Sequence, residues 1–295
     1  MKARSKYNKK EVFTAFLFLL PAMLIFLVFK YIPLIDNFKI SFTNWNLFSP
    51  QKTFVGLQNY KAIFASSLFW KILGNTFFYT VFSTLISVVL GLLVAIALFG
   101  RPSKSRSFLK TLFFVPNVTT ASAVAILWMW IFDPDFGLSG QIFNLLGKQS
   151  PRWLMTPQYA MWIIISLSVW RSMGYVMLIY SSGLAGIGND VYEAATIDGA
   201  SSWQKMTRIT LPLLKPTTYF LVLTSFIQAM QVFDIVSVMT GGGPYDSTNV
   251  LNLYIYQMAF RRSKAGYASA LSVVLFVILL ICTIIQQVAS NKREK

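Results

Sequence analysis

Long stretches without a charged side chain are the feature that most limits what this 295-residue chain can fold into. Residues 72–100 and 265–291 carry no charge over 29 and 27 positions, and a helix needs roughly 20 apolar residues to cross a bilayer. Only 12% of all residues are charged, about half the share typical of a soluble domain. We therefore expect an all-α, polytopic membrane protein that forms one transmembrane domain over residues 1–295. Six spans are expected, at residues 12–33, 72–99, 111–132, 158–185, 217–239 and 267–289.

The first apolar run, residues 12–29, has the properties of a retained span. Its 18 uncharged residues exceed the core of 7–15 residues that is typical of a cleaved signal peptide. No small-x-small cleavage site follows it. The run instead leads into Lys30-Tyr31-Ile32-Pro33, a set typical of the membrane interface.

Lysine and arginine are unevenly divided between the two sides that six spans define. The side with both termini has 15 basic residues among 59 loop positions, whereas the other side has 9 among 90. Because basic residues concentrate in cytoplasmic loops, we expect both termini and the loop at 186–216 to be cytoplasmic. Juxtamembrane lysines then account for the net charge of +16, and no nucleic-acid partner is needed.

Several chemistries can be excluded from residue types alone. The chain has no histidine, so Ser-His catalysis and His-ligated zinc are ruled out, and its single cysteine, Cys282, allows no disulfide framework. The segment 140–149 is the nearest thing to a phosphate-binding loop, but its spacing is wrong, and Gln149 stands where Ser or Thr should follow Gly147-Lys148. We expect no catalysis, no metal site and no cofactor in this chain. No arginine-rich voltage sensor and no Thr-Val-Gly-Tyr-Gly selectivity filter is present either.

A short polar stretch interrupts the apolar chain and has the composition of a docking module. It begins with Glu193-Ala194-Ala195, in which two small residues follow an acidic one, so a helix there could seat closely in a partner. Gly199 can adopt a positive φ and turn the chain. Residues 201–209 can form a second helix, and Pro212 ends it or opens the next.

This spacing of Glu193, Gly199, Ile209 and Pro212 resembles the EAA loop of the membrane subunits of bacterial ATP-binding-cassette (ABC) importers. In that family the loop is cytoplasmic and docks into the ATPase subunit, which agrees with the charge count. An amphipathic helix lying on the membrane is the alternative. The resemblance implies that the ATPase-coupling residues are Glu193, Ala194, Ala195, Asp198, Gly199, Ala200 and Trp203.

Further motifs extend the resemblance over nearly the whole chain. Taken in chain order, these motifs resemble those of the carbohydrate-uptake permeases of ABC importers, the maltose- and glycerol-phosphate-type family. The chain resembles the first of two similar permease subunits, without the two extra N-terminal spans and the large periplasmic insertion of the maltose permease. The motifs are the segments at 54–60, 75–76, 113–116, 183–184, 233–234, 240–244, 259–260 and 266–270.

The resemblance implies an ABC importer permease fold and a set of partners. These are a second homologous permease subunit, two ABC ATPases that carry ATP and Mg, and an extracytoplasmic sugar-binding protein. The solute would be a sugar or oligosaccharide, and the location a bacterial cytoplasmic membrane that the chain crosses several times. The mechanism would be alternating access, driven by closure of the ATPase dimer.

Polar residues inside two expected spans are candidates for the sugar path. Sugars are held by polar side chains and aromatic faces, and a polar residue within a span usually faces the bundle interior or a wet cavity. Helical spacing places the first set on one face, and the second set winds slowly around one side of its span. The candidates are Ser168, Arg171, Ser172 and Tyr175 in the fourth span, and Ser225, Gln228, Gln231 and Asp234 in the fifth.

Alternatives remain open for these residues and for the chain. The stripes could serve interhelical packing, with serines and glutamines bonding across helices. Arg171 and Asp234 could pair with each other or contact the ligand separately. At the level of the chain, the alternatives are an ABC permease for another solute, such as an amino acid or a metal, and a secondary transporter or channel. A proton- or sodium-coupled carrier usually needs buried carboxylates near the midplane, and only Asp234 qualifies.

Overall fold

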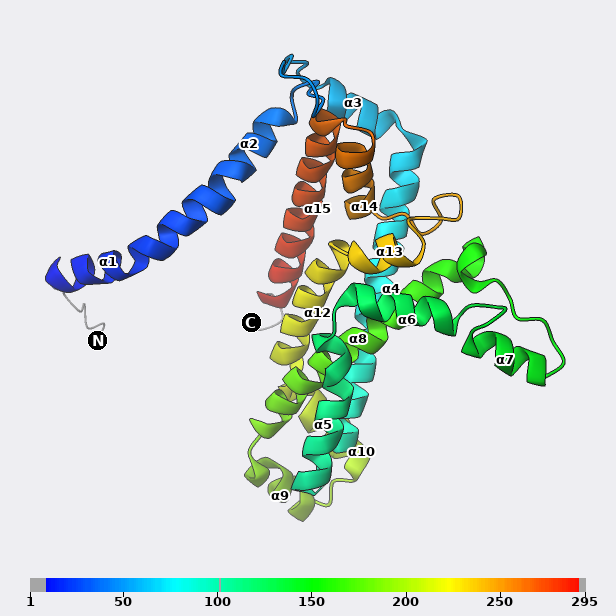
Figure 1. The fold of residues 1–295 in the computed structure, drawn as a ribbon. Helices are drawn as coiled ribbons and strands as arrows, with labels where there is room; N and C mark the ends of the chain where they lie inside the picture. The colour runs from blue at the N-terminus through cyan, green and yellow to red at the C-terminus, as the bar shows by residue number, and fades with distance from the viewer. Residues whose placement is uncertain (1–8, 101, 292–295) are drawn as a thin grey trace. The chain divides into compact units, whose positions relative to one another are not determined.

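The computed structural model describes residues 9–100 and 102–291, and these residues are almost wholly helical (Figure 1). No strand forms within them, apart from an isolated bridge between Thr43 and Phe54. The described residues form two compact units. The first contains residues 9–65 and 255–274, and the second contains residues 66–254 and 275–291.

The first unit holds a long apolar helix and a tied loop. Its helices are α1 Lys9–Phe26, the π-helical turn η1 Leu27–Tyr31, α2 Ile32–Ile40, α3 Gln58–Ala65, the π-helical turn η4 Gln257–Arg261 and the start of α15 Ala265–Asn291. The amide of Asn59 donates to the carbonyl oxygens of Ser41 and Thr43, at 2.8 and 2.9 Å. Gly266 has no room for a side chain, because a Cβ there would lie 1.9 Å from the carbonyl oxygen of Thr43.

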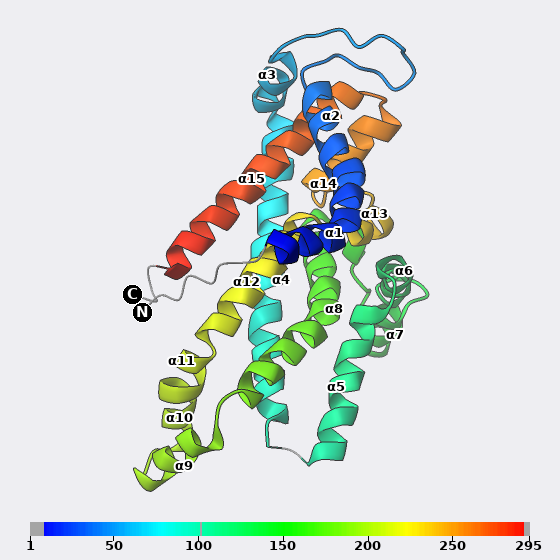
Figure 2. The same cartoon turned by 90° about the vertical axis from the view of Figure 1, so that its left-hand side faces the viewer.

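The second unit contains the remaining helices. They are α4 Ser67–Leu98, α5 Ser103–Val118, α6 Ala121–Ile131, α7 Leu138–Leu145, the 3-10 turn η2 Trp153–Met155, α8 Pro157–Ala185, α9 Asn189–Ile197, α10 Ser202–Lys205, the π-helical turn η3 Met206–Thr210, α11 Leu211–Leu213, α12 Lys215–Met230 and α13 Asp234–Met239; α14 Leu251–Tyr256 follows at its border. Figure 2 shows α9 and α10 at one end of α4 and α8, with α6, α7 and α13 farther along these helices.

Close contact of α8 with α4 and α5 forms the centre of this unit. Ile164, Leu167, Val176 and Tyr180 of α8 are fully buried. Glycines at the contacts let the backbones approach, as is common between membrane helices. A Cβ on Gly174 would lie 2.0 Å from the carbonyl oxygen of Phe113, so α5 sits directly on α8 there.

Among the described residues, four helical segments are long and apolar enough to cross a membrane: Val12–Ile40, Ser67–Leu98, Pro157–Ala185 and Ala265–Val288. The pair α5 and α6 would make a fifth span if it is counted as one, but it is bent by 97°. The predicted six spans therefore stay a prediction. The predicted cytoplasmic termini, residues 1–8 and 292–295, lie outside the described residues.

Two predicted spans are not continuous helices. The predicted span 111–132 is divided where Thr119 and Thr120 take extended conformations. Pro116 lacks an amide hydrogen, and the Thr119 hydroxyl donates to its carbonyl oxygen at 2.8 Å, so backbone and side chain both disfavour continuing the helix. The predicted span 217–239 is interrupted between α12 and α13, where the amides of Gln231 and Val232 donate to residues three positions back and close the last turn.

An acidic turn follows α6. The backbone amides of Phe136 and Asp135 donate to the carboxylate of Asp133, at 2.8 and 2.9 Å. These bonds hold the pKa of Asp133 below its usual range, because they stabilise the charged form. The turn thereby fixes the start of the connection that leads to α7.

Candidate functional site

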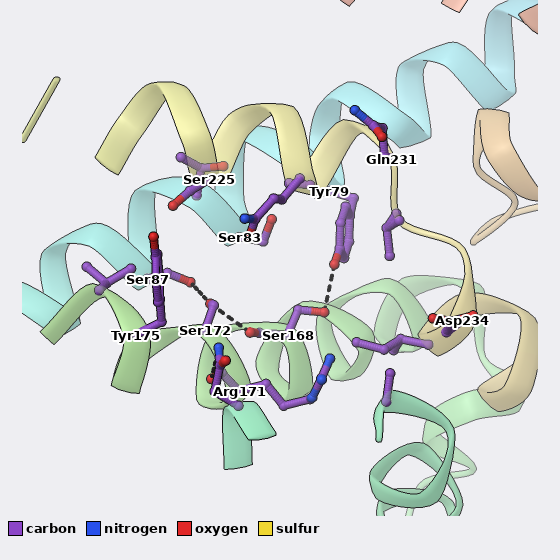
Figure 3. A pocket seen from close by; sticks show the side chains of 18 of the residues that line it. Tyr79, Ser83, Ser87, Ser168, Arg171, Ser172, Tyr175, Ser225, Gln231 and Asp234 are labelled. Carbon is purple, nitrogen blue, oxygen red and sulfur yellow. Dashed lines mark hydrogen bonds between the residues drawn. The ribbon is translucent and has the colours of Figure 1, made fainter. Parts of the chain in front are cut away.

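A polar cavity of about 390 Å³ lies within the second unit, between α4, α8, α12 and α13 (Figure 3). Such a hollow is unusual inside an apolar bundle, because polar groups in a membrane span are costly unless they are paired or wet. All eight residues predicted for the sugar path contribute to its wall. They are Ser168, Arg171, Ser172 and Tyr175 from α8, Ser225 and Gln228 from α12, Gln231 after α12, and Asp234 at the start of α13.

The opposite wall comes from α4, which the sequence analysis did not single out. Tyr79, Ser83 and Ser87 follow at steps of four residues and share one helix face. The hydroxyl of Tyr79 donates to Ser168 Oγ at 2.7 Å, and Ser87 shares a hydrogen bond of 2.7 Å with Ser172. The same helical spacing of polar residues that pointed to α8 was visible in the second expected span and could have found this wall.

The serines of α8 therefore have a packing role as well as a place in the wall. Ser168 is buried and Ser172 is half-buried, and each bonds across to α4. Bonds of this kind between membrane helices are worth roughly 1 kcal/mol. The interhelical alternative thus holds for these two hydroxyls, which also brace one side of the cavity.

Arg171 brings the cationic group into the wall. One terminal nitrogen, Nη2, donates to the carbonyl oxygen of Thr119 at 3.1 Å, in the break between α5 and α6. Its Nε is buried and has no hydrogen-bond partner among the described residues. Within the same part of the chain no ion pair joins Arg171 to Asp234, and Figure 3 shows the two side chains well separated.

The α12 side of the cavity departs from the predicted stripe. Ser225 and Gln228 lie on α12, but Gln231 caps its end and Asp234 begins α13, so the four residues do not share one continuous helix. The amide of Asn252 donates to the carbonyl oxygen of Gln231 at 2.7 Å and holds the chain at the break. The cavity wall is completed by this break rather than by helical periodicity.

The cavity is equipped to bind a hydroxylated solute. Hydroxyls, amide groups, one guanidinium, one carboxylate and the ring of Tyr175 line it, and these groups serve as both donors and acceptors. The hydroxyl of Thr84 and Nε of Arg171 are buried in this wall without a partner in the described residues. A buried polar group costs free energy unless it is hydrogen-bonded, so these two atoms leave the wall of the cavity incompletely satisfied.

The predicted docking module is a compact hairpin of α9 and α10, residues 189–205, which we call the coupling hairpin. Gly199 has φ of +72°, which confirms the predicted positive-φ turn. The amides of Gly199 and Ala200 donate to the carbonyl oxygens of Thr196 and Ala195, at 3.1 and 2.9 Å, the paired bonds of a Schellman motif. Ser201 then opens α10 with a capping box to Gln204.

The outer surface of the coupling hairpin is exposed and partly apolar. Ile197 is 87% exposed and Trp203 is 75% exposed, values that are high for large hydrophobic side chains. Ala195 is buried against the rest of the chain, and Ala200 is half-buried. The other predicted coupling residues, Glu193, Ala194, Asp198, Gly199 and Trp203, are exposed.

A comparison with known protein families places the chain. The family described as "Binding-protein-dependent transport system inner membrane component" matches residues 87–295. The chain belongs to this family. Its relatives include the trehalose/maltose transport system permease protein MalF of Thermococcus litoralis, which is 34% identical over 95% of both chains. The multiple sugar-binding transport system permease protein MsmF of Streptococcus mutans is 31% identical over the full length of both.

The fold agrees with that membership. A crystal structure of a bacterial alginate ABC transporter, in complex with an alginate pentasaccharide-bound periplasmic protein, contains a chain that is 25% identical to this one. It matches with a TM-score of 0.87 and covers 97% of this chain and 96% of that one. The present chain therefore has the fold of an ABC importer permease.

Proposed function

We propose that this chain is a membrane-spanning permease subunit of an ATP-driven ABC importer of sugars or oligosaccharides. The observation that carries the proposal is the polar cavity, which gathers hydroxyl, amide and charged groups inside an apolar bundle. The names of its relatives support the solute class, because MalF, MsmF and the alginate transporter are all described as carbohydrate transport proteins. The carbohydrates named for these proteins differ, so the proposal covers sugars and oligosaccharides as a class and no particular sugar.

In this function the chain forms half of the translocation path and hydrolyses nothing itself. ATP and Mg would be bound by two ATPase subunits, and the coupling hairpin would dock in a cleft of one of them. Closure of the ATPases would displace the hairpin, and the connected helices would turn the cavity outward. Sugar contacts at the cavity would be weak, because a transporter must also release its solute.

The proposed assembly also includes a second homologous permease, an extracytoplasmic sugar-binding protein and a bacterial cytoplasmic membrane. The periplasmic protein in the alginate transporter crystal supports the binding-protein partner.

A proton-coupled carrier is a weaker candidate. Asp234 is the one carboxylate that the described part of the chain contributes to the cavity wall, and this residue is exposed rather than buried.

Reconstitution tests the proposal. The chain is co-expressed with the ATPase, second permease and binding protein encoded beside it, and the complex is placed in lipid nanodiscs. We expect a panel of maltose, trehalose and alginate oligosaccharides, each with the binding protein, to contain a sugar that stimulates ATP hydrolysis severalfold. Amino acids serve as the control solutes. A complex that assembles but responds to an amino acid and to no sugar contradicts the proposal.

A further inference from the structure

Tyr192 lies at a position from which the coupling hairpin can act on two walls of the cavity. It directly precedes Glu193 on α9, yet it faces inward and is half-buried, whereas Val191 and Glu193 on either side are exposed. Its ring lies beside that of Phe99, with 6.3 Å between the ring centroids. Phe99 caps α4, since its amide donates to the carbonyl oxygens of Ala95 and Ile96 at 3.0 Å each. A displacement of α9 therefore reaches the end of α4.

The hydroxyl of Tyr192 makes a second connection, toward α12. It shares a hydrogen bond of 3.0 Å with Thr210 Oγ1, and Thr210 is buried at the end of the π-helical turn η3. The Thr210 hydroxyl also donates to the carbonyl oxygen of Lys205 at 3.2 Å, so Tyr192 is the donor in their shared bond. The carbonyl oxygen of Thr210 in turn accepts from the amide of Leu214, the residue that leads into α12.

The coupling hairpin is stiff enough to move as one piece. Lys205 Nζ donates to Thr196 Oγ1 at 2.7 Å and bridges α10 to α9 across the Gly199 turn. The Thr196 hydroxyl donates in turn to the carbonyl oxygen of Tyr192 at 2.7 Å. This chain of bonds, together with the Schellman motif, returns to the backbone of Tyr192. A force on the exposed face of the hairpin therefore reaches that residue as well.

Packing on one side of this contact is incomplete. A small cavity of about 170 Å³ lies between the coupling hairpin and the ends of α4 and α8. Its wall includes Ile96 and Phe99 from α4, Leu184 from α8, and Tyr192 itself. A void transmits no contact, because its lining atoms have no neighbours on one side. The ring and the hydroxyl of Tyr192 provide two side-chain contacts beside this gap, to Phe99 and to Thr210.

We infer that Tyr192 is the positioning residue that transmits movement of the coupling hairpin to α4 and α12. Both helices form walls of the polar cavity, α4 through Tyr79 and Ser83, and α12 through Ser225 and Gln228. This role rests on the proposed function, since it assumes that an ATPase displaces the hairpin. In this role Tyr192 contacts neither the sugar nor the ATPase.

The test compares sugar moved per ATP hydrolysed in proteoliposomes that contain the complete transporter. Tyr192→Phe keeps the ring and removes the hydroxyl, and we expect this ratio to fall between roughly two- and tenfold, the range for one lost hydrogen bond. Thr210→Val should lower the ratio as well, and adding Tyr192→Phe to it should cause no further loss, because both changes break the same bond. Thr210→Ser keeps the hydroxyl and should restore the ratio.

Tyr159→Phe is the matched control. Tyr159 lies near the start of α8, where its ring packs on Trp153, and it belongs to neither the cavity wall nor the hairpin. Because the Tyr192→Phe change is small, we expect the complex to assemble and its basal ATP hydrolysis to persist. A wild-type ratio in Tyr192→Phe overturns the inference. Failure of the proposed function is distinguishable, because it would appear in the wild-type complex as ATP hydrolysis that none of the three panel sugars stimulates.

Discussion

The cavity and the coupling hairpin differ in how completely their polar side chains are paired. In the hairpin, Thr196, Ser201, Gln204 and Lys205 all bond to one another or to nearby backbone, so that these four side chains are satisfied within the unit. In the cavity, the hydroxyl of Thr84 and Nε of Arg171 are buried without a partner among the described residues. A self-satisfied unit is rigid and suits the transmission of force, whereas unpaired groups suit a site that takes up and releases a polar solute.

The distribution of basic residues predicts that the hairpin is cytoplasmic, and a labelling experiment tests this prediction with an all-or-none result. In a background without Cys282, a cysteine at Asp135 should react with a membrane-impermeant maleimide added outside intact cells, because the distribution of basic residues predicts an outer loop there. A cysteine at Ser202 should react after the cells are opened. The reverse pattern would refute the orientation.

Stiffness of the hairpin depends most on its turn at Gly199. An L-residue at this positive φ costs roughly 1–2 kcal/mol, and a β-branched side chain costs more. We expect Gly199→Val to leave the helices inserted but to remove most sugar-stimulated ATP hydrolysis in nanodiscs. Gly199→Asn is the matched control and should stay near wild type, because asparagine tolerates this conformation. Full activity in Gly199→Val would show that the turn is not needed for coupling.

Substitutions of Arg171 distinguish a cavity wall whose charges bind the solute from one in which Arg171 and Asp234 neutralise each other. Since the structure shows no ion pair with Asp234, we expect Arg171→Ala to lower uptake by roughly tenfold or more, the loss of hydrogen bonds from a charged donor. The double change with Asp234→Ala should be worse still. A double variant that transports better than Arg171→Ala would instead reveal a buried pair, because removing one partner leaves the other charge uncompensated.

A smaller loss is expected at the break after α12. Gln231→Leu removes neutral hydrogen bonds of roughly 0.5–1.5 kcal/mol each, so uptake of the transported sugar should fall between about two- and tenfold. Co-purification of the ATPase serves as the control and should be unchanged. Wild-type uptake in this variant would move Gln231 out of the sugar path, and loss of the ATPase would assign it a structural role.

The local features of the chain were predictable from its sequence where one residue type settles the conformation. Gly199 is such a position, since a turn between two short helices favours the residue that takes a positive φ without strain. The apolar runs likewise mark the long helices α4, α8 and α15. The eight cavity residues were found because polar side chains inside a span need a wet or paired environment.

The breaks in the helices were not predictable in the same way. Hydropathy averages over a window, so Thr119 and Thr120 look like part of an apolar span although they end α5 and turn the chain by 97°. The interruption after Gln231 depends on a bond from Asn252, which is distant in sequence. The wall from α4 was visible as a pattern, but its pairing with Ser168 and Ser172 is set by tertiary packing.

The central claim is that movement of the coupling hairpin opens the polar cavity to the outside. The most direct measurement uses a cysteine at Ser225, in a complex without Cys282, and follows its reaction with an impermeant maleimide added outside sealed proteoliposomes. Trapping the ATPases closed with ATP and vanadate should raise the labelling rate severalfold, and Gly199→Val in the same complex should remove that increase. An identical labelling rate with and without nucleotide would contradict the account.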